Sequence, residues 1–285
     1  MTPTATSEHR VARPAPPLQT LVRRYIGYRY SGLGPGRHLG LPSPDLTLVI
    51  SLGPATELAV MPDPRHPARA FDALIGGLHC RPAVLAHGGD LFGIELDLTP
   101  AGARTLLGLP AGELGGIVVS LDEVVGRSAA EIVDQVRRGG TWKLRFETLD
   151  RLLSSRLSQG PHAGSELENA WRLIVSSGGA VSVSRVAEAV GWSRRHLYQS
   201  FLSEYGVSPK QLARIARFHL SKRMLQRAPA SNLAELAAAC GYCDQSHLTR
   251  EWNRLAGCAP SAWRRTDQIP FVQDGEGTAL AALEP

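Results

Sequence analysis

The sequence predicts an α+β chain of two domains: a β-rich N-terminal domain with added helices, and an all-α C-terminal domain with two helix-turn-helix units. Three observations lead to this prediction. One pattern of apolar residues and glycines occurs twice within about the last hundred residues. Short apolar runs bounded by Gly and Pro fill residues 28–100, which is typical of strands and turns. A length of 285 residues is enough for two domains that each bury a core.

The repeated pattern lies between Val181 and Arg265. Each copy has apolar anchors before a glycine, then two larger apolar anchors, a second glycine and a proline. The matching pairs are Val186 with Leu236, Val190 with Cys240, Gly191 with Gly241, Leu197 with Leu248, Phe201 with Trp252, Gly206 with Gly257, and Pro209 with Pro260. The offset between the copies grows by one residue after the first glycine, where a turn can absorb the insertion.

Each copy predicts two helices joined by a tight glycine turn. In the first copy the apolar anchors recur at helical spacing, Gly191 ends one helix, and Ser193 caps a second helix over residues 194–205. In the second copy Asp244 takes the place of Ser193. A long connecting helix should begin at Pro209, because proline is well tolerated at the first helical position. In such a unit the second helix lies in the major groove of DNA.

The second copy and the residues after it carry a resemblance to a known family. The residues concerned are Gly241, Tyr242, Asp244, Gln245, Ser246, Leu248, Arg250, Trp252, Gly257, Pro260 and Arg264. Together they resemble the AraC/XylS-type transcription regulators, which usually have phenylalanine at the position of Trp252. The resemblance covers about the last hundred residues. It implies two recognition helices that enter successive major-groove segments of promoter DNA, and it implies RNA polymerase as a further partner. It suggests an activator, although repression stays open.

The distribution of charge supports DNA binding independently. Residues 166–265 contain 14 Lys and Arg against seven Asp and Glu, whereas residues 1–165 contain 17 against 15. Positive charge is therefore concentrated on the repeat, as phosphate binding requires. A modest excess of arginine is also compatible with an ordinary solvated surface.

The exposed faces of the two recognition helices supply the candidate DNA-binding residues. Because Leu197 and Phe201 face inward, the outward-facing residues of the first helix include Arg194, and the resemblance assigns base reading to Arg195, Tyr198 and Gln199. In the second helix the resemblance assigns base reading to Ser246, His247 and Arg250, and places Gln245 and Thr249 near phosphate. Roughly half of these residues should contact bases, because at least half of protein–DNA hydrogen bonds go to the backbone.

The N-terminal region predicts strands followed by helices. The expected strands cover residues 46–52, 74–79, 83–86, 91–98 and 117–119, and the expected helices cover 100–107, 128–138 and 141–157. Residues 18–30 fit either a helix or a strand. Several short strands indicate a sandwich or a barrel, and the resemblance implies a cupin-like sensor barrel with a small-molecule effector. The last two helices either pack on the sheet or meet their copies in a homodimer, which the family resemblance favours.

The resulting organisation is a disordered tail over residues 1–17, a sensor or dimerisation domain over 18–157, a linker over 158–165, the DNA-binding domain over 166–265 and an acidic disordered tail over 266–285. The start of the chain has no signal-peptide pattern, and no apolar stretch is long enough to span a bilayer. Four scattered cysteines suit a reducing compartment. We therefore expect a cytoplasmic protein that does not enter the membrane.

Three other patterns suggest chemistry that the repeat does not explain. Cys240 and Cys243 have metal-ligand spacing, but Cys240 matches the core position Val190. A second group, His38, His66, His79, Cys80 and His87, fits no ligand spacing. The sequence at His79-Cys80-Arg81-Pro82 is superficially similar to that of an alkyl-accepting cysteine in some regulators, but only one histidine is adjacent to the thiol. The interpretation is therefore a regulator without enzymatic activity and without a cofactor, with a metal-sensing or alkyl-accepting domain as the alternative.

Overall fold

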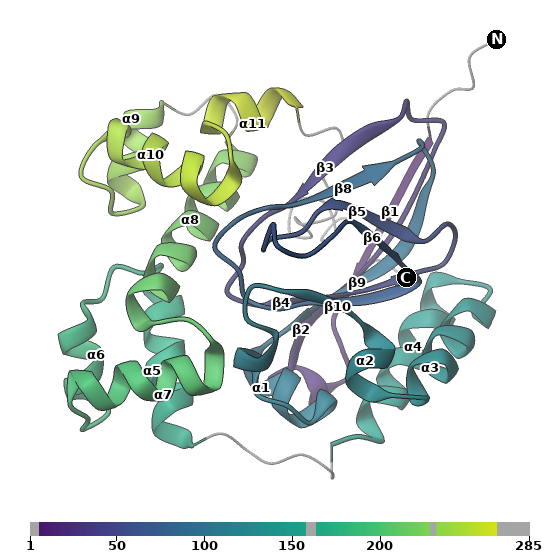
Figure 1. Cartoon of the computed structure of the whole chain (residues 1–285), viewed down its shortest axis with the longest axis horizontal. Coiled ribbons are helices and arrows are strands. Elements are labelled where there is room, and N and C mark those ends of the chain that lie inside the picture. Colours follow the sequence, from purple (N-terminus) through teal and green to yellow (C-terminus); the bar gives the residue numbers. More distant parts are fainter. Residues whose placement is uncertain (1–5, 158–163, 229–231, 267–285) are drawn as a thin grey trace, which may run out of the picture.

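The computed structural model describes residues 6–157, 164–228 and 232–266. Its N-terminal half is a β-sandwich, and its C-terminal half is a group of helices that lies along one side of the sandwich (Figure 1). The prediction of a β-rich domain followed by an all-α domain is thus confirmed, with the sandwich realised and not the barrel. Within the described residues, none of the helices is long and apolar enough to cross a membrane.

The sandwich consists of two antiparallel sheets. The larger sheet has the strand order β1 (Thr6–Ala12), β2 (Val22–Ser31), β9 (Leu91–Leu98), β4 (Leu46–Ser51), β7 (Ala73–Gly76) and β10 (Val118–Ser120). The smaller sheet has the order β3 (Gly36–Gly40), β8 (Ala83–His87), β5 (Thr56–Val60) and β6 (Arg69–Phe71). Because β7 ends at Gly76, the segment with His79 and Cys80 is a loop and not a strand end.

Strand β9 shows how the larger sheet is buried on both faces. Ile94 and Leu96 are fully buried on the face toward the helices, as the alternation in the sequence predicts. Glu95 points the other way but is only 5% exposed. The reason is that its cross-strand neighbour Val49 packs with Leu58 of the smaller sheet, so this face lies inside the sandwich. The smaller sheet therefore covers the polar face of β9, and this face does not meet solvent.

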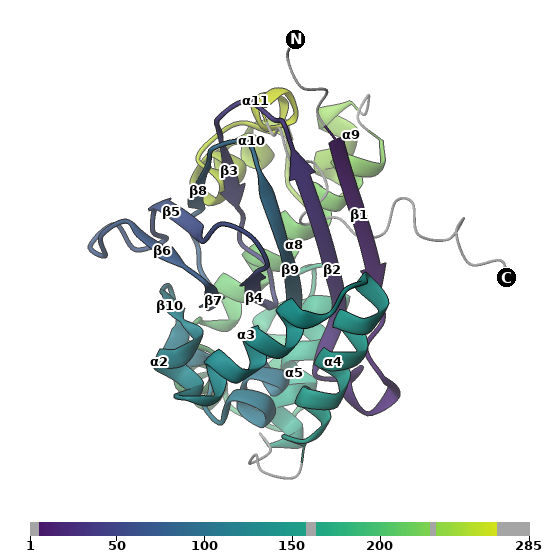
Figure 2. The same ribbon diagram turned by 90° about the vertical axis from the view of Figure 1, so that its right-hand side faces the viewer.

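Two helices cover the outer face of the larger sheet (Figure 2). They are α3 (Ser128–Arg138) and α4 (Trp142–Ser154). The Phe146 ring stacks on Tyr25 of β2 with centroids 5.7 Å apart. The Trp142 ring fills the space beside Gly27, where an added Cβ would lie 2.4 Å from it. The apolar faces of both helices are therefore covered within the chain, and the homodimer that the sequence favoured over this packing stays a proposal.

Short helices lie between strands of the sandwich and before α3. They are η1 (Pro16–Leu18), α1 (Pro100–Gly102), η2 (Ala103–Leu107), η3 (Ala111–Leu114) and α2 (Leu121–Val125). The helical half contains α5 (Ser165–Ser176), α6 (Val183–Ala189), α7 (Arg194–Tyr205), α8 (Pro209–Arg227), α9 (Leu233–Ala239), α10 (Gln245–Ala256) and α11 (Pro260–Thr266). The pairs α6–α7 and α9–α10 are the two helix-turn-helix units, and α8 joins them.

The capping residues that the sequence singled out form the helix ends. The Ser193 and Asp244 side chains accept hydrogen bonds from backbone N–H groups in the first turns of α7 and α10. Both recognition helices end at a left-handed glycine, Gly206 with φ of 68° and Gly257 with φ of 73°. Only glycine adopts this conformation without strain, so the repeat in sequence is a repeat in backbone geometry.

One segment, residues 6–12, departs from the expected organisation. The tail predicted over residues 1–17 is wrong for residues 6–12, because β1 pairs with β2 along its whole length, from Thr6 opposite Ser31 to Ala12 opposite Tyr25. Residues 22–31 form a strand, which settles the alternative left open there. Most of the linker over 158–165 and nearly all of the tail over 266–285 lie outside the described residues, and α5 already begins at Ser165.

Candidate nucleic-acid interface

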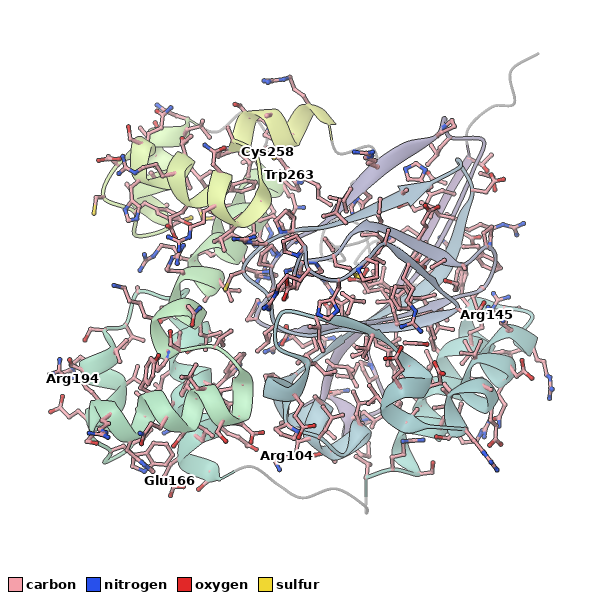
Figure 3. The ribbon with its side chains drawn as sticks, viewed as in Figure 1. Arg104, Arg145, Glu166, Arg194, Cys258 and Trp263 are labelled. Carbon is pink, nitrogen blue, oxygen red and sulfur yellow. The ribbon has the colours of Figure 1, made fainter. Side chains whose placement is uncertain are left out.

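The first recognition helix, α7, is fixed by its inner face. Leu197 and Phe201 are fully buried, and the Phe201 ring stacks on Trp171 of α5 with centroids 6.2 Å apart. The opposite face is exposed and contains all the candidates named from the sequence for this helix, which are Arg194, Arg195, Tyr198 and Gln199. Tyr198 is 50% exposed, so its ring is accessible to a ligand. The N-terminal end of α7, with Arg194, points away from the sandwich (Figure 3).

The second recognition helix, α10, is anchored by Trp252, which is fully buried. Its ring packs at 4.8 Å from Phe218 and at 5.3 Å from Trp263, measured between centroids. The indole N–H donates a hydrogen bond to Ser221 Oγ over 2.9 Å. Ser221 thus satisfies the one polar atom that distinguishes tryptophan from the phenylalanine usual in the family. Trp252 thus fills a core site, as its match with the apolar anchor Phe201 in the repeat indicates.

The candidates on α10 differ in how available they are. Gln245, Ser246 and Arg250 are exposed. His247 is half-buried, because its ring packs edge-on against Tyr242 and its Nδ1 lies 3.4 Å from the backbone N–H of Cys243. Thr249 is also half-buried and donates its hydroxyl to the Gln245 carbonyl over 2.9 Å. The second helix therefore offers fewer unengaged side chains than the first.

The connecting helix α8 holds both units. Arg214 forms a two-point ion pair with Glu251 of α10, with N–O distances of 2.7 and 3.1 Å, and both side chains are largely buried. Arg217 donates a hydrogen bond over 2.8 Å to the Gly179 carbonyl, which lies just before the first unit. These contacts and the continuous helix make α8 a rigid link between α7 and α10.

The arginines on the two exposed faces are not neutralised by the protein. In the part of the chain that the structure describes, the side chains of Arg194, Arg195 and Arg250 make neither a hydrogen bond nor an ion pair. Their charge is therefore available to an external anion. The exposed cations of the described helices that were not singled out from the sequence include Lys210 in the first turn of α8 and Arg254 on α10. Arg254 follows Arg250 by one helical turn, and this spacing could have revealed it.

The cysteine and histidine patterns do not form one site. Cys240 is 3% exposed in the core of the second unit, and burial raises the pKa of its thiol to about 11. Burial also raises the pKa of the Cys80 thiol, despite nearby Arg214 and Arg254, so the thiolate that alkyl transfer requires is disfavoured. His38 and His87 lie on neighbouring strands, whereas His79 lies in a loop. Over residues 6–157, 164–228 and 232–266, no three His, Cys, Asp or Glu are grouped to hold a metal.

Comparison with known proteins agrees with this geometry. A family model described as a helix-turn-helix domain matches residues 167–266. The chain is 29% identical over 68 residues to the uncharacterized HTH-type transcriptional regulator YbfI of Bacillus subtilis. The aligned residues make up 24% of this chain and 24% of that protein. The chain is 24% identical over 132 residues to the Msm operon regulatory protein of Streptococcus mutans serotype c, which covers 46% of this chain and 47% of that protein. The match thus spans less than half the length of these relatives.

One solved fold extends over both halves of the chain. ToxT from Vibrio cholerae O395 superposes with a TM-score of 0.51 at 12% identity, covering 92% of this chain and 98% of ToxT. An apo form of a ToxT variant from Vibrio cholerae strain SCE256 gives a TM-score of 0.53 at 12% identity, covering 85% and 97%. At this identity the likeness concerns the fold alone. The C-terminal domain of the chain is therefore an AraC/XylS-type helix-turn-helix DNA-binding domain, joined to a β-sandwich domain in a ToxT-like fold.

Proposed function

We propose that this chain is a transcription regulator that binds promoter DNA through α7 and α10. The observation that carries the proposal is the pair of exposed recognition helices at repeat-related positions, each with an arginine that the described part of the protein leaves uncompensated, Arg195 and Arg250. Arginine binds guanine O6 and N7 with two hydrogen bonds, Gln199 suits adenine, and the Tyr198 ring suits a thymine methyl group. The excess of positive charge on the same domain supports phosphate binding.

The test is selection of bound duplexes from a random pool by the full-length protein. The expected result is a site with two conserved blocks, one for each recognition helix, separated by about one helical turn of DNA. Affinity should fall steeply as salt increases, because bound phosphates release counterions. Selection of a single block, or binding without sequence preference even at low salt, would contradict the proposal that both helices read bases.

The N-terminal domain contacts the end of α7 directly. Gly206 packs against the η3 segment so closely that a Cβ added to it would lie 3.1 Å from the Gly112 Cα. Beside this contact, Arg104 forms a two-point ion pair with Glu204, with a distance of 2.7 Å between Nε and Oε1. Figure 3 shows Arg104 on the part of the sandwich domain that faces the first unit. The first recognition helix is therefore docked by its C-terminal end.

The second unit meets the sandwich domain at the equivalent turn. A Cβ added to Gly257 would lie 3.6 Å from Cγ of Pro82, in the loop between β7 and β8. Leu41, which follows β3, is 4% exposed and belongs to the apolar core of the second unit. We propose that these two docking points transmit a signal, because a shift of either loop would move one recognition helix relative to the other.

The effector of the sandwich domain is part of the same proposal. One ToxT structure, with a TM-score of 0.50, has an unsaturated fatty acid bound, so a protein of this fold can hold a small molecule. We propose a small-molecule effector for this chain without carrying over the fatty acid. A homodimer, a contact with RNA polymerase and a role as an activator in the cytoplasm are further proposals that rest on the family resemblance.

A further inference from the structure

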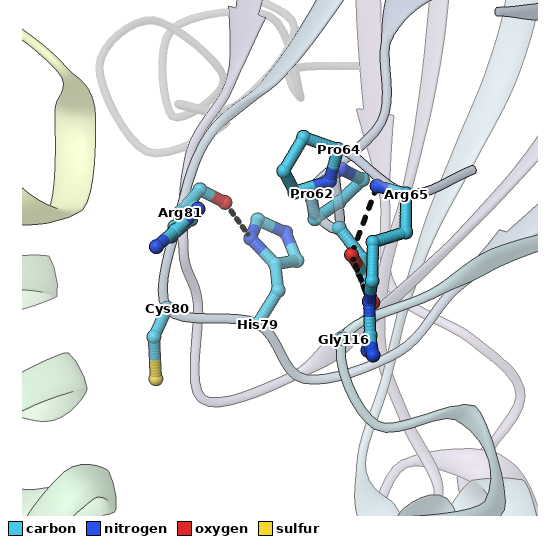
Figure 4. Close-up of a pocket in the computed structure, with 8 residues that line it drawn as sticks. Pro62, Pro64, Arg65, His79, Cys80, Arg81 and Gly116 are labelled. Carbon is cyan, nitrogen blue, oxygen red and sulfur yellow. Dashed lines mark hydrogen bonds and ion pairs between the residues drawn. The ribbon is translucent and has the colours of Figure 1, made fainter. Parts of the chain in front are cut away.

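A cavity of about 430 Å³ lies where three loops of the sandwich domain meet (Figure 4). Its lining residues are Pro62, Asp63, Pro64, Arg65, His79, Cys80, Arg81 and Gly116. They come from the loop between β5 and β6, the loop between β7 and β8, and the segment before β10. A volume of this size falls in the range of small-molecule sites. It lies on loops at the edge of the sandwich and not between the two sheets.

The imidazole of His79 is held in one tautomer on one side of the cavity. Its Nδ1 lies 2.5 Å from the backbone carbonyl oxygen of Arg81. A carbonyl only accepts hydrogen bonds, so Nδ1 carries the proton and Nε2 is an acceptor. Burial lowers the pKa of His79 to about 4, which keeps the ring neutral at physiological pH. Nε2 therefore requires an O–H or N–H donor from a ligand or from water.

The other side of the cavity supplies a cation and an apolar wall. Arg65 is oriented by Asp63, since its Nε lies 3.0 Å from each carboxylate oxygen, while 87% of the Arg65 side chain stays exposed. Arg81 adds a second positive charge, so the lining has two cations and one anion. Pro62 and Pro64 place two rigid rings between these polar groups (Figure 4).

We propose that this cavity binds a small carboxylic acid with an apolar side group and a hydrogen-bond donor on the adjacent carbon, that is, an α-hydroxy or α-amino acid. The carboxylate is bound by Arg65, the hydroxyl or ammonium group donates to His79 Nε2, and the side group packs on the two prolines. The hydroxy and amino acids share this chemistry, and a set of matched compounds separates them.

Occupancy of the cavity acts on the second recognition helix, a consequence that rests on the proposed function. The loop with His79 continues through Cys80, which packs against the core of the second unit, to Pro82 at the Gly257 turn. A ligand that joins this loop to the loop with Arg65 fixes the position of Pro82. Ligand binding therefore selects one arrangement of α10 relative to the sandwich.

The test uses the full-length protein and four compounds with one carbon framework. Mandelate has the hydroxyl and the carboxylate, phenylglycine has the amine and the carboxylate, phenylacetate lacks the donor, and 1-phenyl-1,2-ethanediol lacks the carboxylate. We expect mandelate or phenylglycine to raise the melting temperature saturably at millimolar concentrations, since a ligand of the native state stabilises it. Phenylacetate and the diol should have no effect. Equal shifts with phenylacetate, or shifts with neither acid, would overturn the proposal.

Two variants test whether the acid binds in this cavity. Arg65→Ala should weaken the responding acid by about tenfold, which corresponds to ~1.4 kcal/mol, and His79→Leu should abolish the response. Arg138→Ala is the matched control, an exposed arginine on α3 whose partner is Asp134. Because Arg65 is a surface side chain, its variant stays informative even if His79→Leu fails to fold. An undiminished response in Arg65→Ala would refute the site.

A separate measurement distinguishes this inference from the proposed function. Affinity for a selected duplex is measured with and without the responding acid, and a change of severalfold is expected. If the protein does not bind DNA under any condition, the proposed function is refuted. The melting experiments then still show whether the cavity binds the acid. If the acid binds but DNA affinity is constant, the coupling through Pro82 is refuted.

Discussion

The ion pair between Arg104 and Glu204 joins the sandwich domain to the first recognition helix, and its removal should be costly. Breaking a fully buried ion pair costs about 3–5 kcal/mol, whereas an exposed pair contributes ~0–1 kcal/mol. The side chains of Arg104 and Glu204 are 21% and 10% exposed, so this pair lies closer to the buried limit. We therefore expect Arg104→Ala to lower the free energy of unfolding by about 2–3 kcal/mol, because it leaves a carboxylate largely buried without its partner.

The assay is urea unfolding of the full-length protein, followed by circular dichroism. Arg10→Ala is the control, because Arg10 is 59% exposed and makes a surface ion pair with Glu8; it should cost less than about 0.5 kcal/mol. Adding Glu204→Gln to Arg104→Ala should recover about 1 kcal/mol, since the unpaired charge is then gone. The reasoning is refuted if Arg104→Ala is tolerated as well as Arg10→Ala, or if the second substitution recovers nothing.

Three further predictions concern DNA recognition, the core of the second unit and pH. Arg195→Ala and Arg250→Ala should each weaken binding to a selected duplex by ~1–3 kcal/mol and relax its base preference, as measured by competition titrations; a uniform loss on all sequences would reassign the arginine to phosphate. Ser221→Ala should lower the free energy of unfolding by about 1–3 kcal/mol, because the Trp252 N–H loses its acceptor in a fully buried site, and Trp252→Phe in the same background should make the Ser221 substitution nearly neutral. Burial raises the pKa of Asp45 to about 6, although Arg23 opposes this shift. A raised folded pKa means that the stabilisation by this group is complete at acid pH and is lost as pH rises through about 6. The free energy of unfolding of Asp45→Asn, taken relative to that of the natural protein, should therefore rise between pH 4 and pH 7. A difference in urea unfolding that does not change with pH would contradict the raised pKa of Asp45.

The helical half was predictable because its signals are local. Ser193, Asp244 and the glycines at the helix ends act within one or two turns of chain, so their effects are readable without knowing what packs against them. The inward and outward faces of α7 and α10 follow from the same periodicity. The availability of individual candidates did not follow, because the contact between His247 and Tyr242 depends on how the turn before α10 folds back.

The sandwich was less predictable because strands depend on distant partners. Residues 6–12 are mostly polar and resemble a tail, yet they form β1 because the edge of β2 offers backbone groups to pair with. Glu95 alternates with apolar residues of β9, yet it is buried as well, because the smaller sheet covers this face. Arg104 and Glu204 are 100 positions apart in the sequence, and local spacing patterns cannot predict an ion pair between such distant residues.

Two equivalent glycine turns pack against two different segments of the sandwich domain, one against η3 at Gly112 and the other against the loop at Pro82. The separation of the two recognition helices is thus set partly by their contacts with the sandwich domain. Consider an operator whose two recognition sequences are one base pair closer together or farther apart than the two helices require. To bind it, one glycine turn would have to lose its contact with the sandwich domain. The intact protein should therefore choose among operators by the distance between their recognition sequences as well as by base sequence.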